Sequence, residues 1–172
     1  MSTLHLCAAA GALAGLLVHG TAWAHVTASP NEAVAGSYFT TSFTVPHGCD
    51  GAATVAVRIK IPEGVSDVKP QMKPGWQAST TMRKLEAPLK DDHGNVVTEV
   101  VDEVAWRGGP LPNAFYDSFG LLMKLPATKG ATLYFPTVQE CEKGVHRWIE
   151  IPAAGQQWHD LKEPAPFVRL AP

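Results

Sequence analysis

Proline and glycine residues divide this chain into short segments, and this division limits the folds that it can adopt. The 172 residues include 14 Pro and 15 Gly, too many for a bundle of long helices because both residues destabilise helix interiors. Runs rich in Val, Ile, Thr and Phe lie between them, and these residues favour strands. Strands are expected at residues 37–45, 54–61, 76–85, 96–106, 115–125, 131–138 and 145–151. About eight short strands joined by turns predict a single-domain, all-β sandwich.

Two places show the strand pattern most clearly. Residues 54–61 read TVAVRIKI, which puts the apolar side chains of alternate residues on one face, and they end at the turn 62–64 (PEG). The segments 76–85 and 96–106 flank residues 91–95 (DDHGN), a composition typical of a hairpin turn. We therefore expect a β-hairpin at this position.

The first 24 residues have the features of a secretory signal peptide. Residues 4–23 are small or apolar and contain no Lys, Arg, Asp, Glu or Pro, and they end in Ala22-Trp23-Ala24, an A-x-A type of cleavage site. Several Gly and His residues make the stretch a poor membrane span. We predict a signal peptide at 1–24, export to the periplasm with cleavage after Ala24, no membrane-spanning segment after cleavage, and a short C-terminal tail at 153–172.

Cleavage would leave two cysteines, Cys49 and Cys141, because Cys7 is removed with the leader. An even number of cysteines in an oxidising compartment predicts a disulfide. The alternative is a blue-copper site in which Cys141 and the nearby His146 bind the metal. Such a site also uses a weak axial Met, and the last Met of the chain is Met123, which disfavours this alternative.

The charge balance excludes one class of partner. The chain has 14 Lys and Arg against 16 Asp and Glu, a formal net charge of -2. No basic stripe is present to follow a phosphate backbone, so we expect no binding to nucleic acid.

His25 would be the first residue of the mature chain, and this position gives it a particular chemistry. A free N-terminal histidine offers its α-amine and its imidazole Nδ1 to one metal ion. The pKa of a free α-amine is about 8, so a metal displaces its proton at neutral pH with little cost. Two nitrogen donors in one residue suit tetragonal Cu(II), the divalent first-row ion that such sites bind most strongly. Export would therefore create a copper site.

The order of motifs resembles the YcnI family of exported copper-binding domains over residues 25–152. The motifs that carry this resemblance are His25-Val26-Thr27, Pro30, Gly36, Pro62-Glu63-Gly64, Lys73-Pro74-Gly75-Trp76, Val104-Ala105-Trp106, Phe115-Tyr116-Asp117-Ser118-Phe119 and residues 135–148 (FPTVQECEKGVHRW). The resemblance implies a cupredoxin-like or immunoglobulin-like β-sandwich that holds one Cu(II) through a single-histidine brace at His25, with a carboxylate ligand and a nearby tryptophan. It also implies copper carriers or a copper importer as partners. The motifs at 47–49 (HGC) and 139–141 (QEC) resemble a proteobacterial branch with an added disulfide.

The resemblance leaves the carboxylate ligand open. Ser118 stands where members of the family often have Glu, and the adjacent Asp117 faces the other side of a strand. Glu103 and Glu150, near tryptophans, are the other candidates. Beside the copper we expect second-layer groups, and the candidates for this role are Trp148, Trp106 and His47.

These observations predict a periplasmic Cu(II)-binding protein of copper homeostasis or trafficking that is not an enzyme. One alternative is a two-histidine copper oxygenase, which would need His47 as a copper ligand. The other is a sandwich module that binds a partner protein without metal. His93, in the expected hairpin turn, and His159, in the expected tail, are predicted to be solvated. Met72, Met82 and Met123 are too far apart in the sequence to suggest a Cu(I) site.

Overall fold

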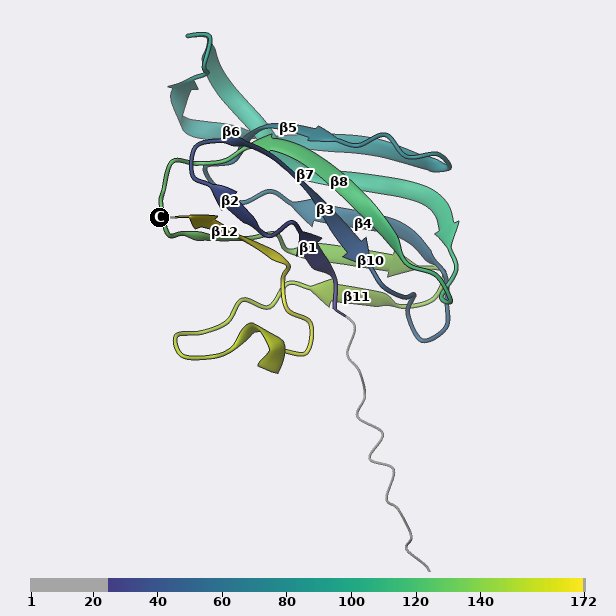
Figure 1. Cartoon of the computed structure of the whole chain (residues 1–172). Coiled ribbons are helices and arrows are strands. Elements are labelled where there is room, and N and C mark those ends of the chain that lie inside the picture. The colour runs from purple at the N-terminus through teal and green to yellow at the C-terminus, as the bar shows by residue number, and fades with distance from the viewer. Residues whose placement is uncertain (1–24, 172) are drawn as a thin grey trace, which may run out of the picture.

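The computed structural model describes residues 25–171 (Figure 1). The predicted signal peptide at 1–24 lies outside the described residues. Within the described part of the chain, no helix is long and apolar enough to cross a membrane.

The chain folds into two main antiparallel sheets that pack face to face, with a small third sheet at one side (Figure 1). The four-stranded sheet has the order β1 (Thr27–Ser29), β3 (Tyr38–Val45), β8 (Asp117–Lys124) and β5 (Ser66–Pro70). The five-stranded sheet has the order β11 (Val145–Trp148), β10 (Thr137–Cys141), β4 (Thr54–Lys60), β7 (Val96–Leu111) and β6 (Trp76–Lys90). The third sheet contains β2 (Glu32–Val34), β12 (Phe167–Ala171) and β9 (Thr132–Tyr134). The predicted all-β sandwich is therefore confirmed.

The core lies between the two main sheets, as the alternating sequence pattern requires. Val57 and Ile59 of β4 are fully buried, because every second side chain of a strand faces the same side. Aromatic rings join the sheets: the Trp106 and Phe119 centroids lie 5.4 Å apart. Burial of these apolar groups is the main term that stabilises the sandwich.

The predicted hairpin is present. β6 and β7 pair antiparallel over most of their length, and the carboxylate of Asp91 accepts hydrogen bonds from the backbone N–H groups of His93 and Asn95 across the turn. The hairpin tip extends beyond the sandwich at the upper left of Figure 1. Most residues of β6 are exposed, because this strand is at the edge of its sheet.

Several predicted strand ends differ from the structure by a few residues, and two differences change the topology. The strand expected at 131–138 is two strands in different sheets, β9 and β10, with Pro136 between them; proline has no N–H for a ladder. The surface tail predicted from residue 153 is wrong for the last strand, β12, which pairs with β2 and β9. Val168 and Leu170 are buried there while Arg169 is exposed, so the alternation of a half-buried strand continues to the end of the domain.

Candidate metal centre

The candidate site lies where the edges of the two main sheets meet. β1 is the edge of one sheet and β11 is the edge of the other, and both lie on the lower side of the sandwich in Figure 1. In the register of β10 with β11, Gln139 is opposite His146 and Thr137 is opposite Trp148. Gln139 and Thr137 are fully buried, and opposed residues of an antiparallel pair share a face. His146 and Trp148 therefore face inward at the edge of the sandwich.

His25 directly precedes β1 and is held by two tryptophans. Its ring centroid lies 5.8 Å from that of Trp148 and 5.3 Å from that of Trp158, both edge-on. Partial burial lowers the pKa of His25 below its ordinary value, and the nearby charge of His47 lowers it further. Because the neutral imidazole is the form that binds metals, the ring keeps this form to lower pH than an exposed histidine does.

His47 lies in the turn between β3 and β4, beside the other rings. Its centroid is 5.8 Å from that of His146 and 6.3 Å from that of Trp148. Nδ1 of His47 is 2.6 Å from the backbone oxygen of Gly48. A carbonyl oxygen only accepts, so Nδ1 carries the proton and the lone pair of the neutral ring is on Nε2.

The predicted disulfide is confirmed, and it ties this turn to β10. Cys49 and Cys141 are bonded across a sequence separation of 92 residues. The backbone N–H of Gly48 donates to the side-chain oxygen of Asn113 at 3.1 Å. The turn that carries His47 is thus attached to the hairpin β10–β11 that carries His146.

Gln139 connects the turn to Trp148 inside the sandwich. Its amide nitrogen donates to the backbone oxygen of His47 at 2.6 Å and to the hydroxyl of Thr54 at 2.8 Å. Its amide oxygen accepts the indole N–H of Trp148 at 3.0 Å. A buried side chain with all of these bonds made fixes the relative positions of the groups that it joins.

The segment between β11 and β12 supplies two further groups. Nδ1 of His146 donates to a carboxylate oxygen of Glu163 at 2.7 Å, and Trp158, in the short 3₁₀ helix η1 (Trp158–Asp160), contacts His25. The carboxylate of Glu150 accepts the backbone N–H of Glu163 at 2.6 Å. Glu150, predicted as a possible copper ligand, here holds the segment that carries Glu163.

The other two predicted carboxylates lie elsewhere in ion pairs. Asp117 pairs with Lys73 at 2.5 Å and also accepts the backbone N–H of Ser118. Glu103 pairs with Arg58 at 3.4 Å. Since Val104 is fully buried and neighbouring side chains of a strand face opposite sides, Glu103 is on the outer face of its sheet.

Of the three predicted second-layer residues, the structure brings Trp148 and His47 to His25. Trp106 is instead a core residue, fully buried against Phe119, and its indole N–H donates to the backbone oxygen of Gln71 at 2.9 Å. We call His25, His47 and His146, with Trp148 and Trp158, the imidazole edge.

The sequence does not predict Gln139, Trp158 or Glu163 as site residues, and His146 is considered only in the disfavoured blue-copper alternative. A signal existed for Gln139, because a polar residue at an inward position of a strand needs a buried partner. His146 and Trp148 are two residues apart and so share a face of β11. Trp158 and Glu163 lie in the segment that the sequence predicts to be a tail, and their placement depends on contacts distant in sequence.

The donor set fits a histidine brace, whose two nitrogens come from one residue. Among residues 25–171, no three His, Cys, Asp or Glu side chains are grouped to hold a metal ion. A brace does not need such a group, because one donor is the α-amine that cleavage before His25 would create. The imidazole of His25, the other donor, is half-buried and lies against Trp148 and Trp158. Its lowered pKa favours the neutral form that binds metal.

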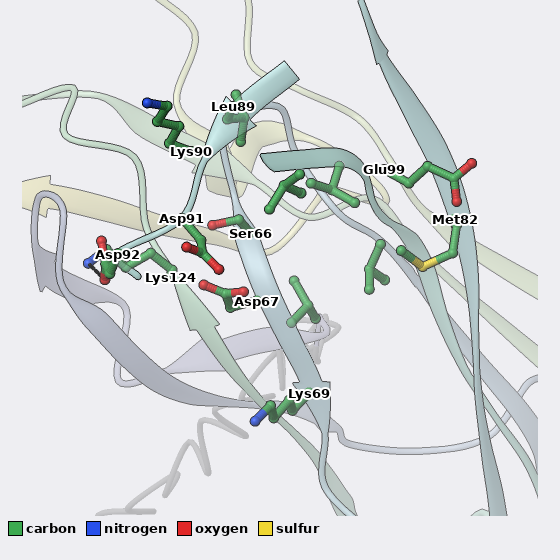
Figure 2. Close-up of a pocket in the computed structure, with 14 residues that line it drawn as sticks. Ser66, Asp67, Lys69, Met82, Leu89, Lys90, Asp91, Asp92, Glu99 and Lys124 are labelled. Carbon is green, nitrogen blue, oxygen red and sulfur yellow. Dashed lines mark hydrogen bonds and ion pairs between the residues drawn. The ribbon is translucent and has the colours of Figure 1, made fainter. Parts of the chain in front are cut away.

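A second feature with many titratable groups is a hollow of about 310 Å³ between β5, the hairpin β6–β7 and β8. Figure 2 shows Asp67, Asp91, Asp92 and Lys124 gathered at one side of it and Met82 and Glu99 at the other. Lys124 pairs with Asp92 at 2.7 Å. We call this hollow the charged groove; it contains none of the predicted site residues.

Comparison with known proteins identifies the family. A family model described as a domain of unknown function, DUF1775, matches residues 25–170. The chain belongs to this family. Its match begins at His25 and includes β12, in agreement with the domain limits of the structure. No curated protein matches the chain significantly.

A solved structure is similar to this DUF1775 domain. It is the crystal structure of an uncharacterized protein from Nocardia farcinica that is reported to have an immunoglobulin-like fold. The TM-score is 0.65 with 28% sequence identity, and the alignment covers 86% of this chain and 99% of that one. The fold is therefore an immunoglobulin-like β-sandwich.

Proposed function

We propose that this DUF1775 domain is an exported Cu(II)-binding protein that holds one copper ion at His25 and acts in copper homeostasis or trafficking in the periplasm. It is a carrier in this proposal and not an enzyme. The YcnI-like motifs and the family match that begins at His25 support the proposal.

The observation that carries the proposal is the placement of His25 between Trp148 and Trp158. An imidazole beside the cleavage site of a leader is ordinarily on a flexible end of the chain. Here two indole rings hold it at the edge of the sandwich, which reduces the entropy lost when it binds a metal.

Each residue has a defined task in this account. His25 supplies its α-amine and imidazole as the two nitrogen donors. Trp148 and Trp158 shield one side of the ring from water, and Gln139 orients Trp148. Bound Cu(II) would supply a ligand-exchange centre. One residue cannot fill all positions of a tetragonal ion, so positions stay open for a donor of a partner, and another copper carrier or a copper importer suits this role.

The carboxylate of Glu163 lies at this edge, hydrogen-bonded to His146. Asp117 and Glu103 are engaged by Lys73 and Arg58, and the carboxylate of Glu150 accepts the backbone N–H of Glu163. We therefore place no carboxylate of the predicted set on the copper, and the brace alone is the core of the proposal.

The proposal is tested by titrating Cu(II), against a competing chelator, into the domain that begins at His25 and into the same domain extended by one N-terminal Gly. The extension turns the α-amine into an amide, so we expect at least tenfold weaker binding. Equal tight affinities for the two proteins would refute the brace. His93→Ala is the matched control because His93 is exposed, and this variant should bind as the wild type does.

Electron paramagnetic resonance of the copper form then separates the alternatives. A two-histidine oxygenase-like site would require His47 as a ligand of the same copper as His25, so His47→Ala would change the number of nitrogens coupled to the first equivalent of copper. A module that binds a partner without metal would show no tight Cu(II) binding in either protein.

A further inference from the structure

A pair of histidines at the imidazole edge has an arrangement that the brace does not explain. His47 and His146 come from separate elements, and both use Nδ1 for a hydrogen bond to an acceptor: the backbone oxygen of Gly48 and the carboxylate of Glu163. Neither acceptor has a proton to give, so Nδ1 is the donor in each ring and the lone pair of each neutral ring is on Nε2. Metal-binding histidines in proteins are oriented in this way.

The spacing of the two rings fits a shared metal ion. Metal–nitrogen bonds of imidazole are about 2.0 Å, and the ring centroid lies about 1.1 Å behind the nitrogen. Two imidazoles on one ion therefore have centroids about 4.5 to 6.3 Å apart, for angles at the metal of about 90° to 180°. The observed separation is 5.8 Å with the rings nearly perpendicular.

A disulfide and two side-chain hydrogen bonds hold the elements that carry His47 and His146 in fixed positions. The Cys49–Cys141 disulfide joins the turn of His47 to the hairpin of His146. Gln139 fixes the backbone of His47, and Glu150 fixes the backbone of Glu163. His47 and His146 are both half-buried, so water has access while the rings stay in place.

We infer that His47 and His146 form a second metal position, for a borderline divalent cation such as Cu(II) or Zn(II), next to the brace at His25. Imidazole nitrogens suit these ions. With two protein ligands this position binds more weakly than a chelating brace. Because Trp148 contacts His25, His47 and His146, the two positions adjoin, and copper has a short route between the brace and the exterior. The inference does not require the brace, since neither donor belongs to residue 25.

The test uses the Gly-extended domain, which lacks a free amine on His25, labelled with ¹⁵N. Zn(II), which is diamagnetic, is added while long-range ¹H–¹⁵N spectra report each imidazole nitrogen. We expect Nε2 of His47 and of His146 to shift together and to saturate at one equivalent, while both Nδ1 atoms remain protonated. No saturable shift of these two nitrogens, or shifts confined to His93 or His159, would overturn the inference.

Variants of the same protein separate ligation from structure. His47→Ala and His146→Ala should each weaken Zn(II) binding at least tenfold, and His93→Ala should have no effect. Glu163→Ala should weaken binding about 10- to 100-fold, and Glu163→Gln, whose amide oxygen still accepts from Nδ1, should weaken it less. Zinc binding as tight as that of the unsubstituted protein in His47→Ala, His146→Ala and both Glu163 variants would contradict the inference. Unchanged amide spectra of β6 and β7 confirm that each variant is folded.

The two proposals fail separately. If the Gly extension leaves Cu(II) affinity unchanged, the brace is wrong, whatever the zinc spectra show. If the extension weakens Cu(II) binding but the zinc shifts are absent, the brace holds and the histidine pair is wrong.

Discussion

The imidazole edge and the charged groove both contain several titratable side chains, but these side chains have different hydrogen-bonding roles. The acids of the groove accept hydrogen bonds, whereas the imidazole Nδ1 atoms of the edge donate them. In the groove, opposite charges and donors satisfy the acids: Lys124 pairs with Asp92, and the hydroxyl of Tyr38 donates to Asp67 at 3.1 Å. At the edge, Nδ1 of His47 donates to the backbone oxygen of Gly48, and Nδ1 of His146 donates to the carboxylate of Glu163. The groove therefore neutralises its own charges, whereas at the edge the acceptors fix the orientation of the imidazole rings.

The two regions also differ in how firmly they are held. The groove is bordered by the tip of an exposed hairpin (Figure 2). The edge is fixed by a disulfide and by the buried amide of Gln139. Ligand orientation and rigidity, more than the number of titratable groups, distinguish a candidate metal site from an ordinary polar surface.

The largest effect is expected from removal of the disulfide. Cys49→Ala with Cys141→Ala should lower the free energy of unfolding by about 2 to 5 kcal/mol, because the bond closes a long loop of the unfolded chain. It should also release the His47 turn from β10 and weaken metal binding at the edge. Urea denaturation and metal titration measure the two effects, and a double variant with wild-type stability and affinity would contradict the account.

The next effect tests the buried amide. Gln139→Leu leaves the indole N–H of Trp148 without its acceptor inside the sandwich, so we expect a loss of about 1 to 3 kcal/mol of unfolding free energy. Gln77→Leu is the matched control, since Gln77 is exposed on β6, and it should change stability by less than about 0.5 kcal/mol. Urea unfolding followed by tryptophan fluorescence compares them. Similar losses of unfolding free energy in the two variants would show that the buried hydrogen bonds of Gln139 do not stabilise the fold.

A smaller effect tests the groove. Asp92→Asn removes the partner of Lys124, but exposed ion pairs contribute little to stability. The urea midpoint and the Cu(II) affinity should stay as in the wild type. A marked loss of copper binding in this variant would place the metal at the groove and not at the imidazole edge.

The smallest effect concerns the hairpin turn. The pKa of Asp91 is lowered mainly by a hydrogen bond from the side chain of Asn95, and also by the backbone N–H of Asn95. The charged carboxylate therefore supports the turn above its ordinary pKa, and this support is lost as the pH falls through the lowered value. Asn95→Ala should raise the pKa of Asp91, as measured by ¹³C NMR; an unchanged pKa would mean that the side-chain bond has no role.

The sequence was sufficient for the fold because its signals are local. Alternation in 54–61 predicted β4, and the composition of 91–95 predicted the hairpin turn. The disulfide followed from two cysteines in a chain that is predicted to be exported. β12 was missed because residues 153–166 read as a polar, irregular segment, although the alternation of Val168 and Leu170 continues after it.

The site was only partly predictable, since it depends on strand register and on an irregular segment. His25 and Trp148 followed from the predicted leader and the family motifs. Asp117 and Glu103 were chosen by nearness in sequence to motif residues, and the register places them in ion pairs elsewhere. Glu163 meets His146 only because residues after β11 return along the edge of the sandwich.

The most direct test of the central claim is a crystal structure of the Cu(II)-loaded domain that begins at His25, with the metal located by anomalous diffraction. We predict copper at the imidazole edge, about 2.0 to 2.1 Å from both the α-amine nitrogen and Nδ1 of His25, as is typical of metal–nitrogen bonds. Copper in the charged groove, or no copper bound to the α-amine of His25, would contradict the account.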